Sequence, residues 1–278
     1  MRMQTTYFYA AALFYAVCAL LPLRQRGLIA AATSVAWLLH AGALWFAMHA
    51  PGGVRLGFAV MLSAALWVSV AAYLVENRNF ALDGLRRLVL PCAAVAAALP
   101  ALFPGAVFQF KGQSPAFGWH IAVALLAYST LTIAAFHAVL MALQEARLHT
   151  RTPPGGRWLS GPLSSALSRS LDQLPALLTM EKLLFRLLGI GFVLLTLTVL
   201  SGVVFSEQLF GAALKWDHKT IFALLSWVLF GALLAGRRWK GWRGKMALRF
   251  TLAGFATLVL AYVGSRFVLE VVLHRTLA

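Results

Sequence analysis

The chain has 278 residues, of which 61% are hydrophobic and only 12% charged. Ordinary soluble domains carry about 25% charged residues, so this composition excludes a water-soluble enzyme or binding domain. The formal net charge of +16 would suit a nucleic-acid partner, but the basic residues lie mostly in short segments between long apolar runs. We therefore expect no nucleic-acid binding.

The apolar residues are arranged in eight blocks, and crossing the hydrocarbon core of a bilayer takes about 20 helical residues. In chain order the blocks cover residues 6–21, 28–48, 58–75, 88–103, 119–143, 183–205, 220–235 and 248–271. They do not alternate polar and apolar residues, as strands of a membrane barrel do. The sequence predicts an all-α polytopic membrane helix bundle of about eight transmembrane helices in one integral-membrane domain.

The basic residues also predict the orientation of the chain. Seventeen of the 24 Lys and Arg fall in the first, third, fifth and seventh connections between the blocks or in the first four residues of the block that follows. Cytoplasmic loops carry the excess of positive charge, so we expect both termini to lie outside, in a bacterial inner membrane. The segment 144–182, rich in Pro, Gly, Ser and Arg, is predicted to be a flexible cytoplasmic loop.

Histidines gather on the predicted outer half. His40 lies past the middle of the second block, His120 opens the fifth, His218 precedes the seventh and His274 follows the eighth. His137 is 17 residues beyond His120, which is roughly 25 Å deeper along a helix. His120 and His137 therefore cannot ligate one metal.

Neutral imidazole is a common protein ligand of haem iron, and tryptophan and arginine near these histidines would suit a porphyrin and its propionates. No Cys-x-x-Cys-His motif occurs, so the haem would be b-type and non-covalent. Two other interpretations remain open. Tryptophan is also enriched at membrane interfaces, and a histidine in a span can simply bond to a neighbouring helix.

Acidic residues are scarce within the blocks. Of the eight Asp and Glu, only Glu270 falls inside a predicted span. Because proton-coupled transporters usually keep carboxylates in their spans, secondary transport is disfavoured. Glu270 follows Arg266 by four residues, which is a favourable helical spacing for an ion pair; Arg266 is also a candidate partner for a haem propionate.

Four features follow one another along the chain: an early span with His40, a span opened by His120, the motif Trp216-Asp217-x-Lys219, and a Gly241-Trp-Arg-Gly244 turn. They resemble features of the CcsA family of cytochrome c assembly proteins, in particular its short YpjD/HemX-like branch. The resemblance implies haem handling outside the membrane. It implies His120 and His274 as the external axial pair, His40 as an intramembrane ligand or orienter, and Trp216-Asp217 as the floor of the pocket. His218 belongs to the same group of outer-side candidates.

The leading hypothesis is a haem-binding assembly factor, not a classical enzyme, that presents haem on the outer side. Its partners would be the lipid bilayer and an assembly partner or apocytochrome. The alternative is a non-catalytic accessory subunit of a transporter or assembly complex that has lost haem. The alternative is favoured by a signature that keeps only Trp216, and by Ala235 where the family has a second intramembrane histidine.

Overall fold

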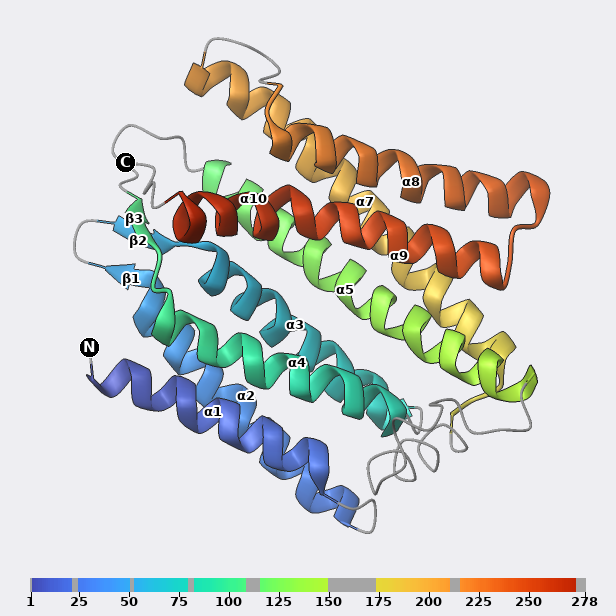
Figure 1. Cartoon of the computed structure of the whole chain (residues 1–278), viewed down its shortest axis with the longest axis horizontal. Coiled ribbons are helices and arrows are strands. Elements are labelled where there is room, and N and C mark those ends of the chain that lie inside the picture. Colours follow the sequence, from blue (N-terminus) through green and yellow to red (C-terminus); the bar gives the residue numbers. More distant parts are fainter. Residues whose placement is uncertain are drawn as a thin grey trace.

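The computed structural model describes residues 2–21, 25–50, 53–79, 83–108, 116–149, 174–210 and 216–273. These residues form eight long helices that run alternately up and down (Figure 1). The helices are α1 (Arg2–Leu20), α2 (Arg26–Met48), α3 (Phe58–Asn79), α4 (Asp83–Leu102), α5 (Ala116–His149), α7 (Leu177–Phe210), α8 (His218–Lys240) and a last helix. The last helix begins as α9 (Lys245–Val259) and continues through π-helical η3 (Leu260–Gly264), α10 (Ser265–Phe267) and π-helical η4 (Val268–Val272).

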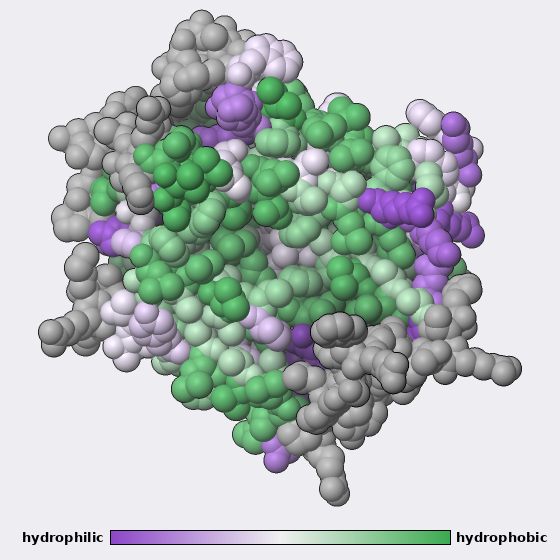
Figure 2. Space-filling model, in the orientation of Figure 1, coloured by the Kyte–Doolittle hydropathy of each residue, from purple (hydrophilic) through white to green (hydrophobic). Residues whose placement is uncertain are grey.

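Seven of these helices are long and apolar enough to cross a bilayer, and α1 adds the shorter apolar segment Thr5–Leu20. Figure 2 shows hydrophobic residues across the middle of one face, with hydrophilic residues toward its edges. The predicted all-α polytopic bundle is therefore confirmed. The side of the membrane on which the termini lie stays a prediction.

Two helices are longer than their predicted spans. The helices α5 and α7 have 34 residues each, or about 51 Å at 1.5 Å per residue, which exceeds the ~30 Å hydrocarbon core. The segment 144–182 was predicted to be a loop, but residues 144–149 belong to α5 and residues 177–182 to α7. Hydropathy marks only the lipid-embedded part of a helix, so the polar ends were missed. Residues 150–173 lie outside the described part.

A small antiparallel sheet, which the sequence did not predict, covers one end of the bundle. It consists of β1 (His49–Ala50), β2 (Gly53–Leu56) and β3 (Ala106–Phe108), in the order β1-β2-β3. We call this end, where α1, α3, α5 and α8 begin, the sheet end (Figure 1). Here a Cβ added to Gly57 would lie 2.7 Å from the Gly105 Cα, so the two chain segments approach as closely as glycine allows.

A buried arginine fastens α1 to α4. Arg86 is fully buried, and it donates from Nη1 to the Cys18 carbonyl at 2.6 Å and from Nη2 to the Leu21 carbonyl at 3.0 Å. The last carbonyls of a helix have no partner within the helix, and the guanidinium supplies one at each site. The sequence predicted that Arg86 lies in a cytoplasmic loop. The structure places it inside the bundle, because it lies in the first turn of α4, beside the end of α1.

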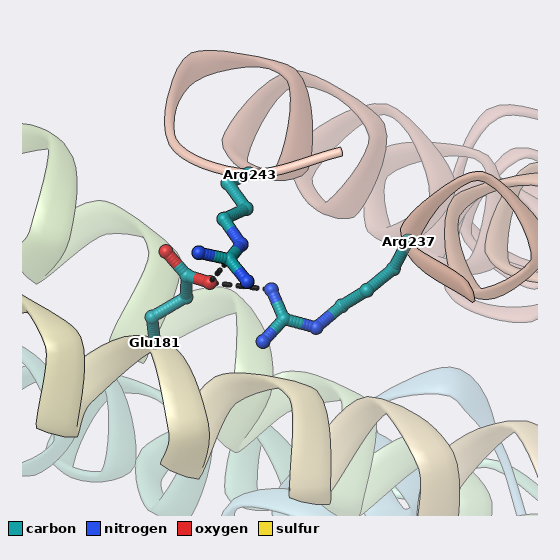
Figure 3. A network of polar contacts seen from close by, with 3 residues as sticks. All are labelled: Glu181, Arg237 and Arg243. Atoms are coloured by element: carbon teal, nitrogen blue, oxygen red, sulfur yellow. Dashed lines mark hydrogen bonds and ion pairs between the residues drawn. The ribbon is translucent and has the colours of Figure 1, made fainter. Parts of the chain in front are cut away.

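The turn between α8 and α9 is a tight basic hairpin, as the sequence suggested. Gly241 and Gly244 have positive φ values of 67° and 53°, which glycine adopts more readily than residues with a Cβ. Figure 3 shows Glu181 of α7 forming ion pairs with Arg237 of α8 and with Arg243 of the turn. The Arg237 guanidinium also lies 3.8 Å from the centroid of the Phe185 ring. These contacts join α7 to α8 and to the turn that leads into α9, at the end opposite the sheet.

Candidate functional site

A cavity of about 450 Å³ lies between α3, α5, α7, α8 and the last helix. This volume is within the range of roughly 300–1,000 Å³ for small-molecule sites. The walls are mostly apolar and include Leu62, Leu66, Leu195, Phe255 and Leu258. The cavity can therefore take a largely hydrophobic ligand.

Polar and basic side chains line the cavity where its helices begin or end at the sheet end. They are His120 near the start of α5, Lys219 and Thr220 at the start of α8, and Arg266 near the end of the last helix. Leu56 of β2 lines the same region. The antiparallel order of the helices brings these distant parts of the sequence to one end, so that a ligand with an apolar body and an anionic edge would find complementary groups.

His120 is held by neighbours on α5 and α7. Its Nδ1 lies 2.7 Å from the Ser201 hydroxyl oxygen. The Phe117 and Phe205 ring centroids lie 6.2 Å and 5.7 Å from that of the imidazole. Within the described residues, the side-chain hydrogen bond of His120 is the one at Nδ1, and its Nε2 makes none. One ring nitrogen is thus engaged and the other remains available for a ligand.

Arg266 forms the predicted ion pair with Glu270, with Nη1 and Oε1 separated by 3.8 Å. The arginine has only 7% of its surface exposed, yet it lines the cavity. It lies between the two π-helical segments of the last helix, and such segments often occur at functional sites. The pair therefore places a buried cation, partly neutralised by a carboxylate, beside the cavity.

His40 points into the bundle, as expected, and it is fully buried. Its Nε2 lies 2.7 Å from the Ser63 hydroxyl and its Nδ1 lies 3.4 Å from the Tyr15 hydroxyl. His40 does not line the cavity. The structure thus does not bring His40 and His120 together, and both ring nitrogens of His40 contact protein hydroxyls.

The Trp-Asp-x-Lys motif opens α8. Asp217 is the N-cap of this helix and accepts hydrogen bonds from the Thr220 amide and hydroxyl at 2.9 and 3.0 Å. Trp216 is 72% exposed and His218 is also exposed, and neither lines the cavity. Trp216 and Asp217 therefore do not form the floor of this cavity; the motif contributes Lys219 instead, because the cap fixes the first turn of α8.

His274 lies outside the described residues, which end at Leu273. The Tyr128 hydroxyl of α5 donates to the Leu258 carbonyl of the last helix at 3.0 Å, so the fifth and eighth helices are neighbours. That adjacency is the condition under which His120 and His274 could approach one another.

His137 does not line the cavity and contacts an acidic side chain instead. It is fully buried, and its Nε2 lies 3.4 Å from Oε2 of Glu76 on α3. The sequence had placed Glu76 just beyond a predicted span, but α3 continues to Asn79. Among the described residues, no group of three His, Cys, Asp or Glu could hold a metal ion. Sequence reasoning also missed Ser201 and Phe205, since nothing in their local pattern marks a contact with α5.

Together, these features define the class of the protein. It is a multi-pass helical membrane protein with an apolar cavity, and His120 at the polar end of that cavity has a ring nitrogen, Nε2, that makes no hydrogen bond within the described residues. The sequence model of the family described as Cytochrome C assembly protein matches residues 5–273. The chain belongs to this family.

Individual relatives show the same likeness. The chain is 29% identical over 185 residues to the inner membrane protein YpjD of Escherichia coli K12, covering 66% of this chain and 64% of that protein. It is 32% identical over 223 residues to an uncharacterized 28.8 kDa protein of Azospirillum brasilense, covering 76% of each. It is 28% identical over 168 residues to the cytochrome c biogenesis protein CcsA of Thermosynechococcus vestitus, covering 52% of each. No solved structure matches the chain.

Proposed function

We propose that the protein binds haem b non-covalently in the cavity and presents it at the sheet end, in a bacterial inner membrane, for cytochrome c assembly. The observation that carries this proposal is the position of His120, whose Nε2 has no partner among the described residues, at the polar end of an apolar cavity of about 450 Å³. A porphyrin likewise joins an apolar ring to anionic propionates. The residues present therefore fit the group.

His120 would hold the iron through its imidazole. Lys219 and Arg266 line the same cavity and would pair with the propionates, as cations do with carboxylates. The walls formed by Leu62, Leu66 and their neighbours would exclude water from the ring. When bound, haem would supply redox-active iron for delivery to an apocytochrome or assembly partner.

The remaining candidate residues would ligate the iron, contact the haem edge or position other side chains. His274 would supply a second imidazole to the iron, since the last helix, which precedes it in the chain, neighbours α5. Trp216 and His218, exposed beside Lys219, would contact the haem edge or the partner. Asp217 would position Lys219 by capping α8. His40 would act as an intramembrane orienter through the Ser63 and Tyr15 hydroxyls.

The test is the visible spectrum of the detergent-purified protein from haem-supplemented cells. We expect a Soret band from the wild type, its loss in His120→Ala, and a shift or loss in His274→Ala. The matched control is His49→Ala, because the His49 side chain contacts the Trp45 carbonyl and ring and does not line the cavity. That variant should keep the wild-type spectrum.

The opposite results are equally informative. A wild-type protein without a Soret band would refute haem binding and favour the alternative of an accessory subunit. A wild-type spectrum in both His120→Ala and His274→Ala would leave haem binding in place and refute the external axial pair.

A further inference from the structure

Ser201 on α7 makes two short contacts through one hydroxyl oxygen. Its Oγ lies 2.7 Å from the Leu197 carbonyl, one turn earlier on the same helix, and 2.7 Å from Nδ1 of His120 on α5. A weaker contact of 3.2 Å reaches the Thr198 carbonyl. The hydroxyl therefore stands between a backbone acceptor and the imidazole.

A serine hydroxyl has one proton to donate and lone pairs with which to accept. The Leu197 carbonyl can only accept, so the 2.7 Å contact with it requires the serine proton. If that proton pointed to Nδ1 instead, two bare oxygens would face each other at 2.7 Å. The arrangement that satisfies both contacts has Ser201 donating to Leu197, and the His120 Nδ1–H donating to Ser201.

We propose that Ser201 is a positioning residue that fixes His120 as its Nδ1–H tautomer and leaves Nε2 unprotonated for haem iron. This inference rests on the proposed function for its purpose, but the tautomer itself belongs to the protein alone. In a neutral imidazole, the hydrogen bond at one nitrogen decides which nitrogen is free to ligate a metal. The Phe117 and Phe205 rings flank the imidazole. A flipped ring would place Cδ2 instead of Nδ1 against Ser201 and would lose the hydrogen bond between them.

The first experiment needs no haem. In ¹⁵N-histidine-labelled apo-protein in detergent, with His120 assigned through His120→Gln, NMR distinguishes a protonated from an unprotonated ring nitrogen. We expect His120 of the wild type to carry its proton on Nδ1, and Ser201→Ala to shift the population toward Nε2–H. Ser201→Thr should restore the wild-type state, because a threonine hydroxyl also bonds the carbonyl one turn earlier.

The second experiment measures haem affinity by titration of the apo-protein. Loss of the hydrogen-bond partner of a ligating imidazole costs about 10–100-fold in metal affinity. Ser201→Ala should therefore bind haem that much more weakly, and Ser201→Thr should bind it nearly as well as the wild type. The matched control is Ser34→Ala, which removes the same hydroxyl from an exposed serine of α2 that is bonded to the Ala30 carbonyl. It should leave haem affinity unchanged.

The outcomes separate the two proposals. Absence of haem binding in every variant refutes the proposed function, while the NMR result still decides the tautomer. A wild-type His120 protonated on Nε2 would overturn the role of Ser201. A Ser201→Ala variant with unchanged tautomer and unchanged haem affinity would do the same.

Discussion

Substitution of Arg86 by methionine removes the hydrogen bonds that join α4 to the end of α1. The guanidinium makes two hydrogen bonds, to the Cys18 and Leu21 carbonyls. Hydrogen bonds to charged groups contribute about 1.5–3 kcal/mol each, so the two contribute roughly 3–6 kcal/mol. Methionine refills most of the volume and avoids burying a charge, which places the expected loss near the lower bound, about 3 kcal/mol. A loss of this size is a factor of about 150 in the opening equilibrium, since 1.4 kcal/mol is about tenfold.

The buried thiol of Cys18 provides the assay. Cys18 is fully buried on α1, whereas Cys92 is exposed. In a Cys92→Ala background, a thiol-reactive fluorophore will label Cys18 only when the end of α1 opens away from its neighbours. We expect Arg86→Met to speed this labelling by about two orders of magnitude, in proportion to the population of the open form.

The control is Arg78→Met, which removes an arginine from an exposed position in the last turn of α3. Surface substitutions usually change stability by no more than about 0.5 kcal/mol, so labelling should stay within about threefold of the wild type. Labelling of Arg86→Met at the wild-type rate would show that the two carbonyls find other partners, and that the buried guanidinium does not hold α1 in place.

Three further predictions concern topology and packing. A reporter fused to the C-terminus should read out in the outer compartment; a cytoplasmic readout would reverse the assignment of the sheet end to the outside. Gly57→Ala should lower the free energy of unfolding in detergent by about 1–3 kcal/mol, because its Cβ would lie 2.7 Å from the Gly105 Cα. Gly42→Ala is the control, since a Cβ at that position has nothing within 4 Å, and equal melting curves for the two variants would contradict the prediction. Glu181→Gln should destabilise the protein by up to about 3 kcal/mol by breaking a partly buried pair with Arg237; in a double-mutant cycle, strict additivity with Arg237→Gln would show that the pair is uncoupled.

The sequence alone determined the class, the number and order of the helices, and the ends at which the key residues lie. The physical reason is that lipid forces backbone hydrogen bonds to be satisfied within each spanning segment, so runs of apolar residues mark helices directly. Consecutive spans then alternate in direction, which was enough to place His120 and the start of α8 at one end of the bundle. The Trp216-Asp217-x-Lys219 motif pointed to the family that the whole-chain match shows.

Only the tertiary structure decided which side chains meet. In a membrane bundle, lipid-facing and neighbour-facing surfaces are both apolar, so hydropathy leaves the rotation and the neighbours of each helix open. The contact of Ser201 with His120 spans 81 residues of sequence, and the pairing of Glu76 with His137 also links separate helices. Packing likewise separates His40 from the cavity and gives Asp217 the role of a helix cap. His120, Lys219 and Arg266 could be named from the sequence, but their hydrogen-bond partners and the cavity they line exist only once the helices are packed.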